Sequence, residues 1–431
     1  MNTSLKITSL HQWHKDAGAN MSDFGGFDMP LWYETGVKNE HLAVLKSAGI
    51  FDTSHMACIN VGGKDAFSLL NYCFTRDITS LSVGRCIYGA FLNDQGHCID
   101  DAIVYKFNDS RFMVCVNAGM GEVIAEHLNS QIIDNQQDKM DVTIDDLTGK
   151  VAKMDIQGKN SARILSKLIK DPELVFQKMP YFSFKGYFSE DMDVPDKDVS
   201  GKVTLLNGTP ILLSRSGYTG EFGFEIFLDP SAIVDLWKDV LKAGAEYGIA
   251  ACGLGARDSL RAGACLPLSH QDIGNWKFIN HPWDFALPYS YSQDKTDKTG
   301  FTKEFLGADA LIKTPEDNFV FPFVGENLRK VNAGEQTQVL DENSENIGRV
   351  LTCATDMGIG IQDQKIISIN TPDLPRDLKI KGISCGFIMV SKQLDFGDKL
   401  TLKEGKRTIT VTIVPDIRPD RTARKKLDNF I

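Results

Sequence analysis

The sequence has no apolar run that could cross a membrane, since a spanning helix needs about 18 or more consecutive apolar residues and no window approaches that length. Residues 1–20 also lack a basic end followed by an apolar segment, and they lack an Arg-rich amphipathic pattern. These absences argue against a secretory signal and against a transit peptide. We therefore expect a cytoplasmic protein that has no membrane partner.

Organised cysteine and histidine motifs are absent as well. The chain has nine cysteines without a CxxC pair and eight histidines without an HExxH or similar ligand spacing. An odd, scattered set of cysteines is typical of free thiols in a reducing compartment, not of a disulfide framework or a zinc site. No metal is expected. The cysteines are Cys58, Cys73, Cys86, Cys98, Cys115, Cys252, Cys265, Cys353 and Cys385.

An excess of positive charge is also missing. The 57 acidic residues outnumber the 47 basic ones and give a formal net charge of -10. This balance disfavours a broad surface for nucleic acid. The 431 residues, 42% of them hydrophobic, are enough for a large core divided over two or three domains.

What the sequence does contain is a dense hairpin pattern at residues 87–107. Apolar residues fill 87–92, the NDQG cluster at 93–96 is typical of a turn, and the second strand carries Asp100 and Asp101. Adjacent strand residues point to opposite faces, so the two aspartates cannot both face solvent. An inward carboxylate needs a partner or a ligand cavity. The pair is either a functional site or an inert, solvated turn pair, and spacing alone favours the second.

Short strands and helices alternate around this hairpin. Hairpins among them favour an α+β domain over a doubly wound parallel sheet. The pattern predicts strands at residues 57–61, 111–117 and 151–156, and helices at residues 37–48, 64–74, 122–130 and 161–169.

A second dense stretch, residues 214–228, contains three glycines and ends in alternating apolar positions. Glu225 lies on the face opposite to Phe224 and Ile226. It therefore points either into a pocket or into water, and the pattern alone favours water.

Residues 253–261, GLGARDSLR, look superficially like a phosphate-binding loop. Asp258 replaces the third glycine of GxGxxG, and no GK[ST] is present, so a nucleotide site is excluded by its own spacing. The sequence allows Asp258 to cap a helix, with Arg257 available to bind a carboxylate.

Taken together, these stretches resemble the aminomethyltransferase family, the T-protein of the glycine cleavage system. The most specific strings are GYTGEFGFE at residues 217–225 and GLGARD at residues 253–258. The string IDDAIVY at residues 99–105 also matches, and the likeness covers most of residues 20–310. Further matching pieces are Met29-Pro30-Leu31, residues 49–56, Ile87-Tyr88, Val116-Asn117-Ala118 and residues 156–158.

The resemblance implies an α+β, folate-binding body of interleaved ferredoxin-like units, followed by a smaller C-terminal β-barrel domain. Tetrahydrofolate would lie in a central channel. Asp101, the second aspartate of the family's pair, would be the catalytic residue beside the reacting nitrogens. Glu225 would accept two N–H bonds from the pterin edge. The other positions that the resemblance assigns to folate are Met56, Tyr88, Tyr105, Asn117, Tyr181, Tyr218, Arg257 and, through a loose alignment of the tail, Arg418.

The implied reaction moves a one-carbon unit from an aminomethyl group to tetrahydrofolate and releases ammonia. The aminomethyl group is carried on the lipoyl arm of a partner, the H-protein. A carboxylate at Asp101 would orient the nucleophile and stabilise the positive charge that develops on the carbon.

The chain departs from the family pattern at residues 260–272. It has LRAGAC where LRLEAG is usual, and LSHQD in place of an LYGxD-like piece, so a glutamate and a tyrosine are absent. This change puts the donor substrate in doubt more than the folate. The alternative is a tetrahydrofolate-dependent demethylase or methyltransferase that acts on an O-, S- or N-methyl donor. His270 is either a substrate contact or, like most lone histidines in loops, a solvated or structural residue.

A third interpretation, a folate-binding accessory protein without transferase activity, is disfavoured by the aspartate pair. We expect an aminomethyltransferase-like domain at residues 1–300 and a barrel domain at residues 301–431. Short β-rich runs at residues 346–353, 386–390 and 408–413 predict the barrel. Two inserts, at residues 190–201 and 361–381, are expected to be surface loops or to reshape partner docking.

Overall fold

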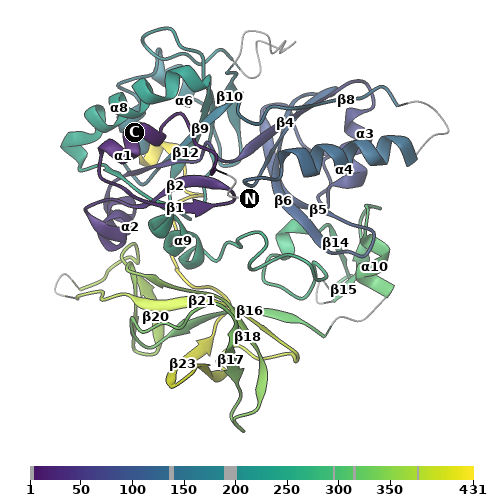
Figure 1. Ribbon diagram of the computed structural model, residues 1–431, viewed down its shortest axis with the longest axis vertical. Coiled ribbons are helices and arrows are strands. Elements are labelled where there is room, and N and C mark those ends of the chain that lie inside the picture. The colour runs from purple at the N-terminus through teal and green to yellow at the C-terminus, as the bar shows by residue number, and fades with distance from the viewer. Residues whose placement is uncertain (1–3, 135–139, 189–200, 295–296, 314–316, 376–377) are drawn as a thin grey trace.

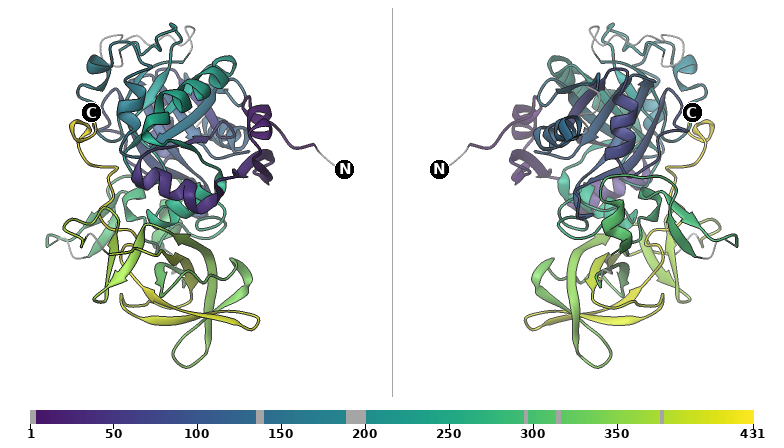
Figure 2. Two further views of the ribbon diagram at one scale, coloured as in Figure 1. Left: turned by 90° about the vertical axis from the view of Figure 1, so that its left-hand side faces the viewer. Right: turned by 90° about the vertical axis from the view of Figure 1, so that its right-hand side faces the viewer.

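The computed structural model of the protein describes residues 4–134, 140–188, 201–294, 297–313, 317–375 and 378–431. An α/β body lies above a β-barrel in Figure 1, and the C-terminal tail returns from the barrel to the body. The two views of Figure 2 show the same arrangement from the sides, with the barrel at one end of the long axis.

The first sheet of the body has six strands in the order β10-β11-β12-β9-β3-β13. All neighbours are antiparallel except β13, which is parallel to β3. The strands are β3 (Gly49–Asp52), β9 (Ala152–Gln157), β10 (Phe184–Gly186), β11 (Leu212–Ser214), β12 (Gly223–Leu228) and β13 (Ala250–Ala251).

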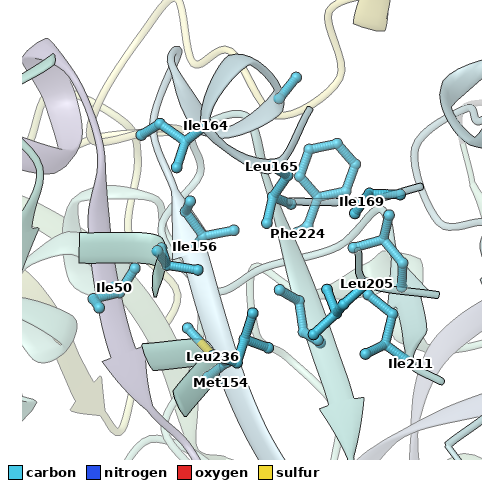
Figure 3. Close-up of a cluster of buried hydrophobic side chains, with 14 of the residues drawn as sticks. Ile50, Met154, Ile156, Ile164, Leu165, Ile169, Leu205, Ile211, Phe224 and Leu236 are labelled. Atoms are coloured by element: carbon cyan, nitrogen blue, oxygen red, sulfur yellow. The ribbon is translucent and has the colours of Figure 1, made fainter. Parts of the chain in front are cut away.

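Helices α5 (Ser161–Leu165), α6 (Pro172–Phe176) and α8 (Ile233–Gly244) cover the outer face of this sheet. Helix α8 has apolar residues at helical spacing, including Leu236, and these bury its inner stripe. In Figure 3, Leu236 and Ile164 lie over the strand residues Met154 and Ile156, which point outward from the sheet.

The second sheet has five antiparallel strands in the order β5-β6-β7-β4-β8. Helices α3 (Ala66–Cys73) and α4 (Gly121–Asp134) pack on its outer face through Leu69, Leu70 and Leu128. The strands are β4 (Ala57–Gly62), β5 (Arg85–Leu92), β6 (Cys98–Asn108), β7 (Arg111–Val116) and β8 (Thr143–Asp146).

The inner faces of the two sheets pack against each other. Tyr105, Phe107 and Met113 of the second sheet share one apolar cluster with Phe184 and Phe227 of the first. The Tyr105 and Phe227 rings meet edge to face, with their centroids 5.7 Å apart. Each sheet is thus covered by helices on one face and by the other sheet on the second face.

Smaller elements surround these layers. A hairpin of β1 (Asn20–Phe24) and β2 (Phe27–Trp32) lies between helices α1 (His11–Asp16) and α2 (Gly36–Lys46) in the sequence. Helix α9 (Leu254–Gly263) packs on both α2 and the barrel. The remaining elements are β14 (Tyr289–Tyr291), β15 (Lys298–Phe301), α10 (Ala308–Lys313) and the 3₁₀ turns Pro230–Ala232, Ala245–Tyr247, Asp284–Ala286 and Leu427–Asn429.

The barrel is closed by six antiparallel strands in the order β16-β21-β18-β17-β22-β23, because β23 pairs with β16. Its interior holds Phe323, Val339, Val350, Ile388 and Val411. The strands are β16 (Phe319–Gly325), β17 (Gly334–Leu340), β18 (Asn346–Asp356), β21 (Ile383–Val390), β22 (Lys399–Glu404) and β23 (Arg407–Ile413). Between β18 and β21 the sequence forms a further hairpin, which consists of β19 (Ile359–Gln362) and β20 (Lys365–Ser368).

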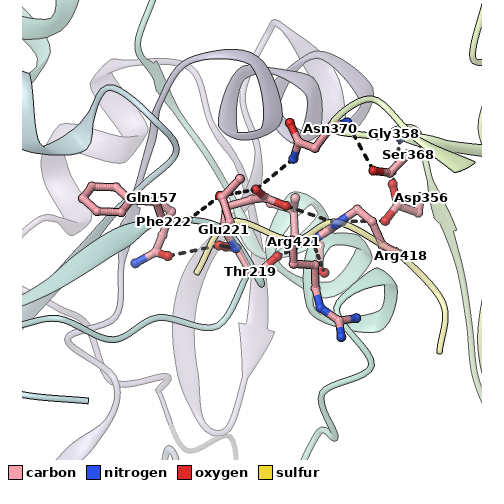
Figure 4. A network of polar contacts seen from close by, with 12 residues as sticks. Gln157, Thr219, Glu221, Phe222, Asp356, Gly358, Ser368, Asn370, Arg418 and Arg421 are labelled. Carbon is pink, nitrogen blue, oxygen red and sulfur yellow. Dashed lines mark hydrogen bonds and ion pairs between the residues drawn. The ribbon is translucent and has the colours of Figure 1, made fainter. Parts of the chain in front are cut away.

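A buried polar network joins the barrel, the body and the tail (Figure 4). Asp356 at the end of β18 accepts hydrogen bonds from His41 Nε2 at 2.9 Å and from Arg418 Nη1 at 2.5 Å. Glu221 lies 3.3 Å from Arg418 Nε and also accepts from Asn370 Nδ2 at 3.2 Å. Burial acts to raise the pKa of Asp356, but Arg418 and His41 outweigh it and hold that pKa well below its usual range.

The tail completes the core of the first sheet. After β23 it runs back to the body, where Phe430 stacks on Phe222 with the ring centroids 4.1 Å apart. The Phe222 amide donates to Thr422 Oγ1 at 2.9 Å. The last residues of the chain are therefore part of the body and not of the barrel.

The structure confirms the α+β class and the C-terminal barrel. The predicted strands and helices are present, although the helix predicted at residues 161–169 ends earlier, at Leu165. The insert at residues 361–381 contains part of the β19 and β20 hairpin, whereas the insert at 190–201 falls, apart from Gly201, outside the described residues. The division into 1–300 and 301–431 stays a prediction.

Candidate active site

A cavity of about 1070 Å³ lies between the two sheets and α9. Both sheets, α9 and the tail contribute residues to its wall. Eight of the ten residues that the sequence assigned to a site line this cavity, although they come from segments far apart in the chain. These eight are Met56, Tyr88, Asp101, Asn117, Tyr181, Tyr218, Glu225 and Arg257.

The hairpin of β5 and β6 carries the aspartate pair to one wall of the cavity. Its turn is set by Asn93, whose side chain accepts from the amides of Gln95 and His97 at 3.0 Å, and by Gly96 at a φ of 77°. On β6, Asp101 shares the inner face with Tyr105, and Asp100 points to the opposite face. Because both faces of this sheet are covered, both aspartates are buried.

The two carboxylates share one donor. Asn117, which follows β7, donates from Nδ2 to Asp100 Oδ1 at 2.8 Å and to Asp101 Oδ1 at 2.7 Å. The Tyr88 hydroxyl donates to Asp101 Oδ2 at 2.8 Å. Asp100 also accepts from the Asn117 amide at 2.9 Å and from Ser269 Oγ at 2.7 Å. The pair is therefore buried and hydrogen-bonded, and the expectation that it is solvated is wrong.

The pair holds a proton more tightly than isolated aspartates do. Burial, together with the charge of Asp101, raises the pKa of Asp100 to about 7. Burial also raises the pKa of Asp101, although the bonds from Tyr88 and Asn117 oppose the shift. Near neutral pH Asp100 therefore changes between its neutral and its charged form, and this titration belongs to the pair.

Glu225 lies at the first sheet, across the cavity. Its side chain is buried, and Oε1 accepts from Lys153 Nζ at 2.5 Å, while Oε2 accepts from the Ser216 hydroxyl. Glu225 points to the same side of β12 as Phe227, which faces the second sheet. The expectation that the alternating pattern turns Glu225 toward water is wrong, because the second sheet covers that face.

Arg257 enters the cavity from the first turn of α9. It donates to Asp155 Oδ2 at 2.7 Å, and its guanidinium lies 4.9 Å from the centre of the Tyr218 ring. Helix α9 begins after Gly253, so Asp258 lies inside the helix and pairs with Arg261 at 2.7 Å. The prediction that Asp258 caps this helix is wrong.

Two predicted residues lie outside the lining. Tyr105 is fully buried between the sheets, where its ring packs on Phe184 and Phe227. Arg418 belongs to the network of Asp356 and Glu221 behind the cavity. Neither side chain reaches the cavity surface, so their assignment to folate rests on the resemblance alone.

The structure also places further residues near the site, and of these the sequence had singled out only His270. Ser269 contacts Asp100 from the segment that departs from the family pattern, and His270 Nε2 lies 3.9 Å from the same carboxylate. The His270 side chain is 54% exposed, which fits a solvated residue. Lys153 and Asp155 of β9 contact Glu225 and Arg257 from behind. Their only signal in the sequence is the alternation in AKMDIQ, which is equally typical of a half-exposed strand.

The described part of the chain offers neither a metal site nor a membrane-spanning helix. Within it, no group of three or more His, Cys, Asp or Glu side chains is arranged to hold a metal ion. None of the helices described there is both long and apolar enough to span a bilayer. All nine cysteines are free thiols, and most of them are buried.

Comparison with known proteins places this site in a family. The model of the GCVT N-terminal domain matches residues 10–279, which is more than half of the chain. An aminomethyltransferase of Staphylococcus epidermidis is 33% identical over 351 residues, which cover 81% of this chain and 86% of the relative. The chain belongs to the aminomethyltransferase family.

A second relative and a solved structure support the same family assignment. An aminomethyltransferase of Bacillus cereus is 30% identical over 387 residues, which cover 86% of this chain and 97% of the relative. The crystal structure of the glycine cleavage system aminomethyltransferase T from Bartonella henselae has a TM-score of 0.74 and 23% identity, and covers 98% of this chain and 99% of that one. The last comparison shows that the whole fold, including the barrel, is the family's.

Proposed function

We propose that this family member is a tetrahydrofolate-dependent aminomethyltransferase of the glycine cleavage system. It would move the one-carbon unit of an aminomethyl group on the lipoyl arm of H-protein to tetrahydrofolate and release ammonia. The observation that carries the proposal is the pair of buried carboxylates, Asp101 and Glu225, on the facing sheets of one cavity. The curated relatives carry the same activity in their names, which favours it over methyl transfer.

The cavity suits a folate in size and chemistry. Its volume of about 1070 Å³ is slightly above the range of roughly 300 to 1,000 Å³ for small-molecule sites, as suits a large ligand. The Glu225 carboxylate keeps lone pairs beyond those used by Lys153 and Ser216, and these match the two parallel N–H donors of an aminopyrimidine edge. The Tyr88, Tyr181 and Tyr218 rings supply flat apolar surface for an aromatic ligand.

Tetrahydrofolate supplies the nucleophilic nitrogens that accept the carbon. Asp101 is the group placed to act on the reacting atoms, because it is buried in the wall and fixed by Tyr88 and Asn117. Its negative charge stabilises the positive charge that develops as the carbon's bonds to sulfur and nitrogen break. The fixed geometry also lowers the entropic cost of aligning donor and acceptor. The departing amino group and the departing lipoyl sulfur would take up the two protons that the folate nitrogens lose, which gives ammonia and the lipoyl dithiol.

The test is a single-turnover assay with tetrahydrofolate and aminomethylated H-protein that follows ammonia and the oxidation level of the folate product. We expect ammonia and methylene-tetrahydrofolate from the wild type. Asp101→Asn should be slower by about tenfold to a thousandfold, because it removes charge and keeps shape. Asp94→Asn, at an exposed aspartate in the turn of the same hairpin, is the matched control and should keep the wild-type rate.

The outcome separates the folate site from the donor. Folate binding without ammonia would overturn the aminomethyl donor and leave the folate site standing. Methyl-tetrahydrofolate formed from O-, S- or N-methyl compounds would then identify the demethylase alternative. An Asp101→Asn variant with full activity would remove Asp101 from the reaction.

A further inference from the structure

Strand β9 places two charged side chains behind the wall of the cavity. Lys153 and Asp155 are two residues apart and therefore project from the same face of the strand. Both are almost completely buried, with 2% and 0% of their surfaces exposed. Their neighbours Met154 and Ile156 project from the other face into the apolar cluster of Figure 3. Charges in the middle of a sheet are unfavourable unless they are paired with one another.

These two residues connect the two ligand-facing charges of the wall. Lys153 Nζ donates to Glu225 Oε1 at 2.5 Å and to Asp155 Oδ1 at 2.7 Å. Asp155 uses its other oxygen, Oδ2, to accept from Arg257 Nη1 at 2.7 Å. The contacts thus run from Glu225 through Lys153 and Asp155 to Arg257, with two negative and two positive groups. Only the two end members, Glu225 and Arg257, line the cavity.

The sheet register explains why this chain of contacts is rigid. Strand β9 lies between β12 and β3, and Asp155 is directly opposite Glu225 on β12. Thr53, which follows β3, donates to Asp155 Oδ1 at 3.0 Å and accepts from Lys153 Nζ at 3.2 Å. The positions of both carboxylates are therefore fixed by three neighbouring segments and not by one flexible side chain.

Burial alone would neutralise these groups, and their mutual attraction prevents it. Burial acts to lower the pKa of Lys153, but Asp155 and Glu225 outweigh it and raise that pKa above its usual range. For Asp155, burial acts to raise the pKa, and Lys153 and Arg257 outweigh it and lower it. Both side chains therefore stay charged throughout the neutral range.

Among the described residues, Lys153 is the one cation that forms an ion pair with Glu225. The other titratable groups that act on Glu225, from β5, β6, β7 and the segment before β10, are Cys86, Tyr105, Cys115 and Tyr181. Burial is among the causes that raise the pKa of each, so all four are uncharged near neutral pH. His55 also lies near this group of charges, but burial lowers its pKa to about 4, so it is neutral near pH 7 and supplies no positive charge to Glu225 or Asp155.

We propose that Lys153 and Asp155 are positioning residues for the ligand: Lys153 holds its ammonium against the Glu225 carboxylate and keeps that carboxylate aimed into the cavity, and Asp155 fixes Arg257 at the same wall. The inference rests on the proposed function, because the ligand that Glu225 receives there is the aminopyrimidine edge of a folate. A protonated or displaced Glu225 cannot accept two N–H bonds at once. Lys153 and Asp155 would thus determine affinity and specificity for that edge without touching it.

The test compares tetrahydrofolate binding at pH 6, 7 and 8 by the full-length wild type, Lys153→Met and Lys153→Arg. We expect the dissociation constant of Lys153→Met to rise at least tenfold at pH 8 and further at pH 6, because burial favours the protonated carboxyl once the ammonium is gone. Lys153→Arg keeps the charge and should restore most of the affinity. At saturating folate, the turnover of Lys153→Met should stay within about threefold of wild type, since Asp101 and its partners are untouched.

Lys106→Met is the matched control, because Lys106 is a buried, ion-paired sheet lysine whose partner is Asp109 and which does not line the cavity. It should bind folate as the wild type does at every pH. Should Lys153→Met fail to fold, as judged by circular dichroism, Asp155→Asn takes its place. That variant leaves the Lys153 contact with Glu225 and releases Arg257, so its dissociation constant should rise without the added dependence on pH.

The two proposals fail in different ways. A wild type that does not bind tetrahydrofolate would overturn the proposed function together with this inference. A wild type that binds, with Lys153→Met equal to it from pH 6 to 8, would overturn the inference alone. Equal binding by Asp155→Asn would do the same where that variant carries the test. A lower turnover of Lys153→Met at an unchanged dissociation constant would also count against a positioning role.

Discussion

The aspartate pair predicts how the stability of this protein depends on pH. Asp100 has an ordinary pKa near 3.8 and a folded-state pKa of about 7. Between these values the folded protein holds a proton that the unfolded chain has lost, so the stability of the wild type falls as pH rises through this range. Above about pH 7 neither state holds the proton, and the cost of the buried charge is fully present.

Asp100→Asn removes this titration and keeps the shape of the side chain. Between pH 4.5 and 7, an interval of about 2.5 pH units, the wild type loses the stability that the Asp100 proton provides. The unfolding free energy of the variant should therefore rise by about 3 kcal/mol relative to that of the wild type across this interval. At every pH the variant should also lose about 1 kcal/mol of stability. The cause is that one of the donors to Asp100, the Asn117 amide or the Ser269 hydroxyl, would face the amide nitrogen of the new asparagine, which cannot accept a hydrogen bond. The curve of the difference against pH, not its value at one pH, therefore carries the prediction.

Urea unfolding followed by circular dichroism at half-unit steps of pH measures this difference. Asp94→Asn, at the exposed turn of the same hairpin, should run parallel to the wild type throughout. If the curve for Asp100→Asn also ran parallel to the wild type, Asp100 would titrate normally in the folded protein. That result would refute the inference that burial between two covered sheet faces makes the aspartate pair hold a proton.

Three further predictions concern packing and positioning. Gly263→Ala should lower the unfolding free energy by about 3 kcal/mol in urea titrations, because a Cβ there would lie 1.8 Å from Asp356 Oδ2. Phe430→Ala should lower the melting temperature through a loss of about 3 kcal/mol of stacking in the body core, whereas Phe396→Ala, 63% exposed, should leave it unchanged. Tyr88→Phe removes the bond to Asp101 and should reduce the rate constant of the single-turnover assay about tenfold at saturating tetrahydrofolate.

Local patterns in the sequence determined most of the secondary structure and the class of the fold. The turn at Asn93 to Gly96 follows from side chains that bond their own backbone and from a glycine that accepts positive φ. The spacing of apolar residues was enough to predict α2, α3 and α4 and the strands β4, β5, β6 and β7 of the second sheet. These features depend on residues a few positions apart, and so a single sequence contains the information for them.

Only the tertiary structure decided which polar residues are buried and what they contact. The alternating pattern of β12 left Glu225 facing either water or a pocket, and the decision came from a second sheet whose strands lie about a hundred residues away in the sequence. Lys153 and Asp155 look like half-exposed strand residues until β12 and α9 cover them. Arg418 lies outside the cavity lining because its guanidinium is used by Asp356 and Glu221, contacts that no local pattern encodes. Sequence periodicity determines from which face of a strand or helix a side chain projects, and the packing of distant segments determines what that side chain contacts.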